Sequence, residues 1–199
     1  MKPNPLHRLP APLEAAIERL KLTAREASGR SVESLGLAAL AAQYAQQRDV
    51  LLSAQYELNR RSALFTLRFN EALDEHVLRD LGASDGRSGA PAPTAWDTLS
   101  LVEDREVEAQ ITADRFALEV AHACEWELRE LDGYVATVLA EVDDASPGGR
   151  ERNPLRPELL GHALVRGVEA VSDQATVRKQ LVAELGRSLG ALLRSTYAA

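Results

Sequence analysis

The chain has few of the residues that most often mark a functional site. Its 199 residues include a single cysteine, Cys124, which excludes an internal disulfide and a cysteine-rich metal site. No stretch reaches the roughly 18 apolar residues that a membrane span needs, and the N-terminal section lacks the apolar run of a secretory signal. We therefore expect a reduced, cytoplasmic protein with no membrane association.

Signatures of catalysis and of nucleotide binding are also missing from the sequence. The G-x-S-x-G nucleophile motif, the Walker-type phosphate loop and the dinucleotide Gly fingerprint do not occur. No alternation of apolar and polar residues, as in a strand, continues over more than four residues. The sequence therefore favours a non-enzymatic protein without β-sheet, and it predicts no cofactor.

Charge is unevenly distributed along the chain, whose formal net charge is −7. Residues 97–146 carry 14 acidic and 3 basic side chains, whereas residues 150–199 carry 8 basic and 5 acidic ones. An acidic middle section is a poor match for nucleic acid, whose phosphates need a basic face. We therefore expect no nucleic-acid partner, and we expect the basic C-terminal helices to pack beside the acidic section.

Helix-forming sequence makes up most of what is present, because Ala and Leu supply most of the apolar residues. Pro12 fits the first position of a helix, and Gly29 fits the position just after its end. Between them, apolar residues recur at spacings of three and four, which predicts one buried face. This stripe consists of Leu13, Ile17, Leu20 and Ala24.

A second helical tract runs from residue 31 to residue 81, with a break expected at residues 31–36. One position repeats every seven residues: Leu37, Tyr44, Leu51, Leu58, Phe65 and Ala72. The other positions of a coiled-coil seam are mostly polar, so a bundle helix packed along one stripe competes with a true coiled coil. For contact with a protein partner or a second copy, the expected interface residues are Leu51, Leu58, Phe65 and Phe69.

Residues 82–95, GASDGRSGAPAPTA, are rich in Gly, Ser, Pro and Ala. We interpret them as a flexible linker. They divide the chain into N-terminal helices, residues 1–81, and C-terminal helices, residues 96–199. We expect these two parts to pack as one unit.

An acidic helix is expected after this linker. Ser100 and Glu103 match the S-x-x-E capping box, and the apolar spacing extends the helix from about residue 102 to about residue 142. Gly133 lies inside that helix and costs about 1 kcal/mol relative to alanine, which suggests that something packs closely there.

Two further helices complete the predicted fold. One begins at Pro157, and the other covers residues 174–197 and is capped by Ser172 or Asp173. Together the elements predict an all-α protein, an antiparallel helical bundle of five or six helices, two of them long.

Glu119 and His122 are the one pair with the spacing of metal ligands on a helix. Ferritin-like di-iron bundles use two such Glu-x-x-His pairs, because residues three apart share a face. This sequence has one pair, so a metal-dependent bundle enzyme is kept as the second alternative and no metal is predicted. Cys124 points away from His122 and is expected to be a buried thiol.

Arg150, Arg152 and Arg156 surround the Asn153-Pro154 entry to a helix. Guanidinium groups near a helix N-terminus bind anions such as nucleotide phosphates. The first alternative is therefore an anionic-nucleotide sensor that uses these three arginines to bind a small anionic ligand. The plainer interpretation is a solvated loop in which Arg156 pairs with the acidic helix.

Three blocks of the sequence resemble a known family. They are residues 97–108 (DTLSLVEDREVE), residues 153–157 (NPLRP) and a helix over residues 177–197 that ends in LLRSTY. In sequence and order they resemble the proteobacterial family called domain of unknown function 1631, whose members are usually several times longer. The resemblance implies that the chain is the N-terminal part of such a protein or a short relative. It implies no activity and no catalytic residue.

These features favour a non-enzymatic helical module that acts through protein–protein contacts in a regulatory role. The basis is the half-complete heptad pattern and an acidic helix that carries no recognisable site chemistry. The hypothesis predicts a homodimer or a complex with a protein partner.

Overall fold

The computed structural model describes residues 9–82, 104–140 and 153–198 of the chain. Within these residues there are six α-helices and no strand. The prediction of an all-α protein with two long helices is confirmed, since α1 has 31 residues and α2 has 38. The helices are α1 (Ala11–Ala41), α2 (Ala45–Gly82), α3 (Asp104–Ala123), α4 (Glu125–Ala140), α5 (Pro157–Val171) and α6 (Ala175–Tyr197).

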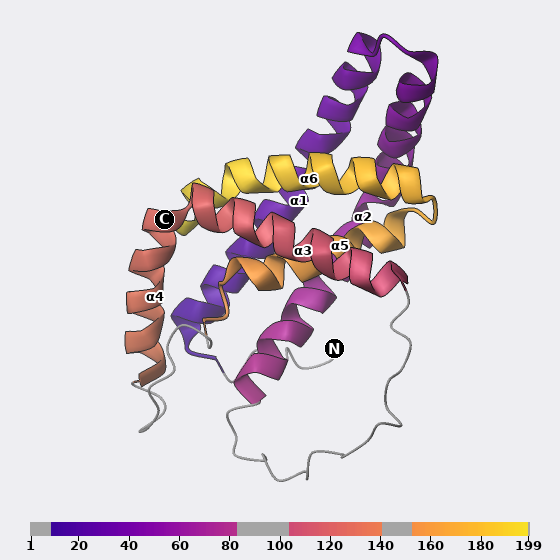
Figure 1. Ribbon diagram of the computed structural model, residues 1–199. Helices are drawn as coiled ribbons and strands as arrows, with labels where there is room; N and C mark the ends of the chain where they lie inside the picture. The colour runs from indigo at the N-terminus through magenta and orange to yellow at the C-terminus, as the bar shows by residue number, and fades with distance from the viewer. Residues whose placement is uncertain (1–8, 83–103, 141–152, 199) are drawn as a thin grey trace, which may run out of the picture.

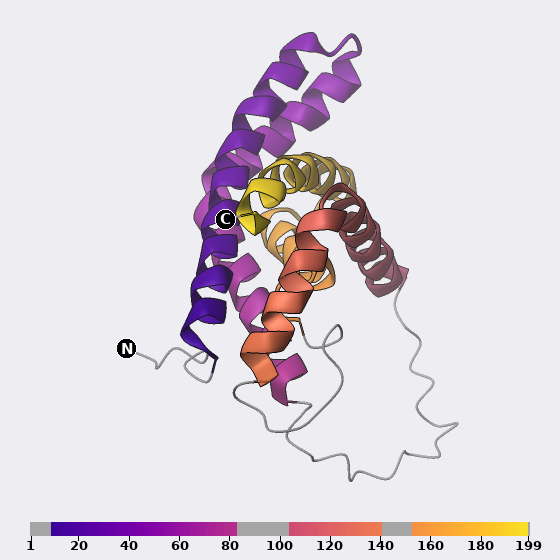
Figure 2. The same ribbon diagram turned by 90° about the vertical axis from the view of Figure 1, so that its left-hand side faces the viewer.

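The helices form two crossing layers (Figure 1, Figure 2). α1 and α2 run antiparallel as a long hairpin, and the end of the hairpin that joins them projects beyond α6. α3, α5 and α6 lie across the hairpin, and α5 runs antiparallel to both α3 and α6. One continuous apolar core includes side chains from all six helices. The expected helical bundle is therefore present, with the C-terminal helices packed against the N-terminal ones.

The first helix ends later than the sequence predicts. Gly29 is expected to end it, but α1 continues through Gly29 and Gly36 to Ala41. A glycine inside a helix costs about 1 kcal/mol relative to alanine. At Gly36, the side chain of Gln55 on α2 lies close to the helix, with its Nε2 2.5 Å from the position that a Cβ would take. The chain turns instead at residues 42–44, between the two helices.

The heptad stripe of α2 packs inside the chain. Leu51, Leu58, Phe65 and Phe69 are each at most 4% exposed, and α2 packs against α1, α5 and α6. The expected role of these four residues as an interface is corrected accordingly, because none of them is accessible to a partner in this fold. The heptad pattern correctly identified a buried stripe. The stripe is covered by helices of the same chain rather than by a partner.

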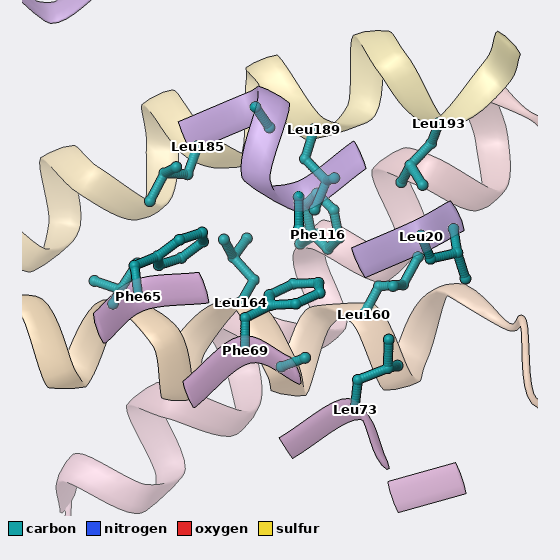
Figure 3. Packing of buried hydrophobic residues seen from close by; sticks show 14 of the residues in the cluster. Leu20, Phe65, Phe69, Leu73, Phe116, Leu160, Leu164, Leu185, Leu189 and Leu193 are labelled. Carbon is teal, nitrogen blue, oxygen red and sulfur yellow. The ribbon is translucent and has the colours of Figure 1, made fainter. Parts of the chain in front are cut away.

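The core lies where α2 crosses α5 (Figure 3). Phe65 and Phe69 of α2 lie with their ring centroids 5.9 Å apart, and they pack beside Leu160 and Leu164 of α5. All four side chains are almost completely buried. Full burial of one such side chain stabilises a fold by about 1.5–3 kcal/mol, so this crossing is a main source of stability.

Close contacts between helices occur at glycines of α5 rather than of α4. The prediction for Gly133 is wrong, because Gly133 is exposed and nothing lies within 4 Å of the place its Cβ would occupy. At Gly161, a Cβ would collide with the backbone carbonyl of Ala113 on α3. At Gly167, a Cβ would lie 2.8 Å from the Phe65 ring on α2. The missing side chains let α5 approach α3 on one side and α2 on the other.

The acidic helix is bent rather than continuous. The single helix expected over about residues 102–142 is two helices, α3 and α4, that meet at Cys124. Backbone hydrogen bonds still bridge the junction: Cys124 N–H donates to Val120 O and Leu128 N–H donates to Cys124 O, both at 2.9 Å. Beyond the bend, Val135 of α4 is fully buried in the core. Cys124 is itself buried, as predicted.

The entry to α5 is fixed by hydrogen bonds to α4 and α6. The helix begins at Pro157, as predicted. Asn153 Nδ2 donates to Asp132 Oδ1 of α4 at 2.7 Å, and the backbone N–H of Leu155 donates to Asn153 Oδ1 at 2.9 Å. The hydroxyl of Tyr197, at the end of α6, donates to Leu155 O at 3.0 Å.

The remaining predictions about the fold have mixed outcomes. α6 begins at Ala175, one residue later than predicted, and the N–H of Gln174 donates to Ser172 Oγ at 3.2 Å. The capping box at Ser100 and Glu103 and the linker beyond Gly82 lie outside the described residues. Among the helices that are described, none combines the length and the apolar character needed to cross a membrane.

Candidate functional site

A groove of about 870 Å³ runs between α3 and α6. Its walls are residues 107–119 of α3 and residues 175–187 of α6, and residues of α5 contribute to its floor. Twelve residue steps along each helix correspond to about 18 Å at a rise of 1.5 Å per residue. The groove is therefore a little more than three helical turns long.

The floor of the groove is apolar. Phe116 of α3 and Val168 of α5 are buried there, and Val182 of α6 is partly buried. Gly186 of α6 has no side chain, so the Phe116 ring approaches the α6 backbone; a Cβ at this glycine would lie 3.3 Å from the ring. Ile111, on the wall of α3, is 61% exposed to solvent. Phe116 and Val168 are already covered, so the apolar surface on which further burial would be favourable is that of Ile111 and Val182.

The two walls differ in charge. The α6 wall contributes three cations to the lining, one of them paired with Glu184 of the same helix, and the α3 wall contributes two acidic residues and one arginine. The cations of α6 are Arg178, Lys179 and Arg187, and the charged residues of α3 are Glu108, Arg115 and Glu119. A basic wall stands out in a chain whose net charge is −7.

One ion pair spans the groove. Lys179 Nζ of α6 lies 2.9 Å from Glu108 Oε1 of α3. The hydrogen bond and the charge of Lys179 hold the pKa of Glu108 below its usual value. Both side chains remain more than half exposed, so the pair is of the solvent-screened kind that contributes little to stability.

The other two cations of the α6 wall have partners on their own side of the groove. Arg187 pairs with Glu184 of the same helix at 2.6 Å. Arg178 Nη1 donates to the backbone carbonyls of Ser172 at 3.5 Å and Asp173 at 2.7 Å, beyond the C-terminal end of α5. These contacts leave the guanidinium groups at the edge of the groove.

Glu119 and His122, the pair kept for the second alternative, lie on an exposed face of α3. Glu119 pairs with Arg115 at 3.3 Å, and His122 is exposed. Over the described ranges, no group of three or more His, Cys, Asp or Glu side chains is arranged to hold a metal ion. Glu119 instead forms part of the wall of the groove.

The predicted arginine cluster is described only in part. Arg150 and Arg152 lie outside the described residues. Arg156 precedes the first residue of α5 and its guanidinium lies 2.5 Å from Asp80 Oδ2 of α2, with both side chains about three-quarters buried. Binding of an anion by the three arginines therefore stays a prediction.

A second, more polar cleft was not predicted from the sequence. It lies between α2, α3 and α5, has a volume of about 720 Å³, and contains His76 and His162 stacked at 5.0 Å between ring centroids. Burial lowers the pKa of His76, and the neighbouring His162 and Arg79 lower it further. The two histidines are far apart in the chain, so no local motif connects them. The charged side chains around them are Glu75, Arg79, Glu106, Arg166 and Glu169.

The projecting end of the hairpin is the third unusual surface. Leu37, Leu40 and Tyr44 lie there and are exposed. Residues 34–56 contain only two charged side chains, Arg48 and Asp49. The first two positions of the predicted heptad stripe therefore face solvent instead of the core.

These features define the class of the protein: an all-α helical protein with an open groove that has an apolar floor and charged walls. The model of the family described as protein of unknown function (DUF1631), N-terminal domain, matches residues 8–199. The chain belongs to this family, as the three sequence blocks predicted. No curated protein and no solved structure matches it.

Proposed function

We propose that the chain is a non-enzymatic interaction module that binds an amphipathic helix of a protein in the groove between α3 and α6. The observation that carries the proposal is the groove itself, with its apolar floor and charged walls. Helices that bind in grooves place apolar anchors at positions i, i+3, i+4 and i+7 on the floor and keep polar residues at the rim. A groove of about 18 Å accommodates anchors from three turns of such a helix.

The composition of the groove supports a protein ligand. Protein interfaces combine an apolar centre with a polar rim; in the groove, Val182 is only partly buried and lies beside the already buried Phe116 and Val168. The exposed side chain of Ile111 is a further apolar contact for a bound helix. We place this module in the cytoplasm, because its one cysteine is a free, buried thiol, and we assign it a regulatory role.

The test uses a designed helical peptide of about four turns with leucine on one face and glutamine elsewhere. Hydrogen exchange of the full chain should show protection in α3 and α6 when the peptide binds. Ile111→Asp should abolish binding, because it places a charge on the apolar wall. Leu22→Asp is the matched control, since Leu22 is 64% exposed on α1, outside the groove.

Two outcomes would overturn the proposal. One is no detectable binding at peptide concentrations up to about 1 mM. The other is binding that persists in Ile111→Asp or that protects α1, α2 or α4, which do not line the groove.

A further inference from the structure

We propose that the projecting end of the hairpin is a self-association surface, through which two copies of the chain form a dimer. This surface consists of residues 34–56, which include the last turns of α1 and the first turns of α2. It lies apart from the groove between α3 and α6, so the inference does not depend on the proposed function. Three observations support a second copy as the occupant: exposed apolar side chains, the lack of net charge and the available area.

The first observation is the exposure of five large apolar side chains. They are Leu37 (69% exposed), Leu40 (85%), Tyr44 (71%), Leu52 (45%) and Tyr56 (64%). Two residue steps rotate a helix by about 200°. Leu37 therefore points away from the buried Leu35, and Tyr56 points away from the buried Ala54. An apolar group of this kind at the end of a projecting hairpin marks an interaction surface.

The arrangement of the helices leaves this surface open. α3, α5 and α6 lie across one side of the hairpin, and its end extends beyond α6 (Figure 1, Figure 2). In four-helix bundles, two hairpins of antiparallel helices pack together and bury the faces that each leaves open. A second hairpin of the same chain therefore has the shape to cover the exposed leucines and tyrosines.

The second observation is the lack of net charge. Residues 34–56 carry one positive and one negative side chain, Arg48 and Asp49, whereas the whole chain has a net charge of −7. A two-fold dimer brings each surface against its own copy, and like charges in contact weaken such an interface. Because the net negative charge lies outside residues 34–56, two copies meet at this surface without like-charge repulsion in the contact.

The remaining residues of the surface also suit an identical partner. Gln43, Gln46 and Gln47 are exposed, and an amide side chain both donates and accepts hydrogen bonds, so it pairs with a copy of itself. Ala41 and Ala45 are exposed as well, and small side chains shorten the distance between packed helices. A partner with a charged contact face would lose hydration here without gaining opposite charges, which favours a second copy of this surface.

The third observation is the available area. Fully exposed leucine and tyrosine side chains offer about 100 Å² and about 200 Å² of surface, respectively. With the exposed fractions above, the five side chains provide roughly 500 Å² per copy, or about 1,000 Å² over two copies. This area is the lower limit for a specific interface. We therefore expect a dimer with a dissociation constant in the micromolar range.

The experiment measures the mass of the full chain by sedimentation or light scattering at concentrations from about 1 μM to about 1 mM. The wild type should change from monomer to dimer in this range. Leu40→Glu should weaken dimerisation by at least about 30-fold, because it places an unpaired charge in the contact. The matched control is Leu118→Glu on α3, where the leucine is 72% exposed and lies outside residues 34–56; it should leave the dimer unchanged.

A thiol probe shows where the two copies meet, without a charged substitution that could disturb folding. The one native cysteine, Cys124, is buried, so Leu40→Cys adds one accessible thiol. Its rate of alkylation should fall severalfold when the concentration rises from the monomer range to the dimer range. The rate for Leu118→Cys should stay the same, because this position remains exposed in the dimer.

Three results would overturn the inference: a wild-type chain that is monomeric at about 1 mM, a dimer insensitive to Leu40→Glu, or equal protection of the two introduced thiols. A monomeric chain that sediments with phosphatidylglycerol vesicles, and no longer does so in Leu40→Glu, would assign the surface to a lipid bilayer instead.

The inference and the proposed function fail independently of each other. Ile111→Asp, which alters the groove, should leave the dimer unchanged. Leu40→Glu should leave binding of the designed helical peptide unchanged. Loss of dimerisation in Ile111→Asp would place the contact between copies at the groove and would overturn the assignment to residues 34–56.

Discussion

Glu108 of α3 and Lys179 of α6 form an ion pair across the opening of the groove, with 2.9 Å between Oε1 and Nζ. The pair connects the acidic section of the sequence to the basic C-terminal section. This contact confirms the expectation that the two sections pack side by side with complementary charges. It also means that a bound helix has to separate the pair.

Glu108→Gln is expected to strengthen binding of an acidic helix. The substitution removes the carboxylate that holds Lys179 and leaves the cation available to the ligand. For an exposed charge, we expect an increase in affinity of about two- to fivefold, measured by titration with a labelled amphipathic helical peptide that carries glutamate on its polar face. The control Glu71→Gln removes a similar exposed pair on α2, that of Glu71 with Arg68. An equal change in both variants would contradict a specific role for Glu108.

Gly167→Ala is expected to destabilise the fold. The added methyl group would lie 2.8 Å from the Phe65 ring, and overpacking of this kind costs about 1–3 kcal/mol. Gly190→Ala on α6 is the matched control, since nothing lies within 4 Å of its Cβ position, and it should stabilise the helix by up to about 1 kcal/mol. Urea denaturation of both variants measures the two effects. Equal stability of the two variants would show that the α2–α5 crossing tolerates the extra volume.

The buried ion pair between α1 and α2 provides a third test. Lys21 Nζ lies 2.8 Å from Asp74 Oδ1, and its side chain is 10% exposed. Asp74→Asn should cost about 1–3 kcal/mol, because it removes one of the two carboxylates that pair with Lys21 and leaves Glu18, 2.7 Å away, as its remaining partner. The double variant Lys21→Met, Asp74→Leu should recover most of that loss, since it buries no charge. Denaturation curves decide between these outcomes, and a double variant as unstable as the single one would contradict the argument.

Stability is expected to fall at mildly acidic pH because of His76. Burial lowers the pKa of this residue below 6.5, and the positive charges of His162 and Arg79 lower it further, while Glu75 and Asp80 oppose the shift. The unfolded chain therefore binds the proton more readily than the folded chain does. The free energy of unfolding therefore has its full value above about pH 6.5. It decreases as the pH falls through the lower folded-state pKa of His76.

The measurement is the free energy of unfolding between about pH 7.5 and pH 5. His76→Gln should reduce its pH dependence in this range, whereas His122→Gln should not, because His122 lies exposed on α3. Parallel curves for the wild type and His76→Gln would contradict the assignment.

The sequence predicts what is local and misses what depends on contacts between distant segments. Apolar spacing identified the helices, and Pro157 marked the start of α5 correctly because its fixed backbone angle acts locally. Gly29 and Gly36 indicated a break that α1 does not have, because a glycine inside a helix costs only about 1 kcal/mol and does not by itself end the helix. The true turn at residues 42–44 contains neither Gly nor Pro, so no local signal marks it.

The candidate site could not be predicted from local sequence patterns, because it too depends on contacts between distant segments. The groove exists because α3 and α6 both pack against α5, and its walls are about 70 residues apart in the sequence. A heptad stripe likewise shows that one face of a helix is buried, but it does not show which helix or partner covers that face. In this chain the stripe that includes Leu58 and Phe65 is covered by the chain's own helices.

The hydrogen bond from the Tyr197 hydroxyl to Leu155 O joins the end of α6 to the residues before α5. Because α5 leads into α6 through a short turn, this bond closes the segment over residues 155–197 into a loop fastened at both ends. Burial raises the pKa of Tyr197, so the hydroxyl remains a donor at high pH. The two helices should consequently open to solvent as one cooperative unit, and the hydrogen-exchange rates of α5 and α6 should rise together in Tyr197→Phe.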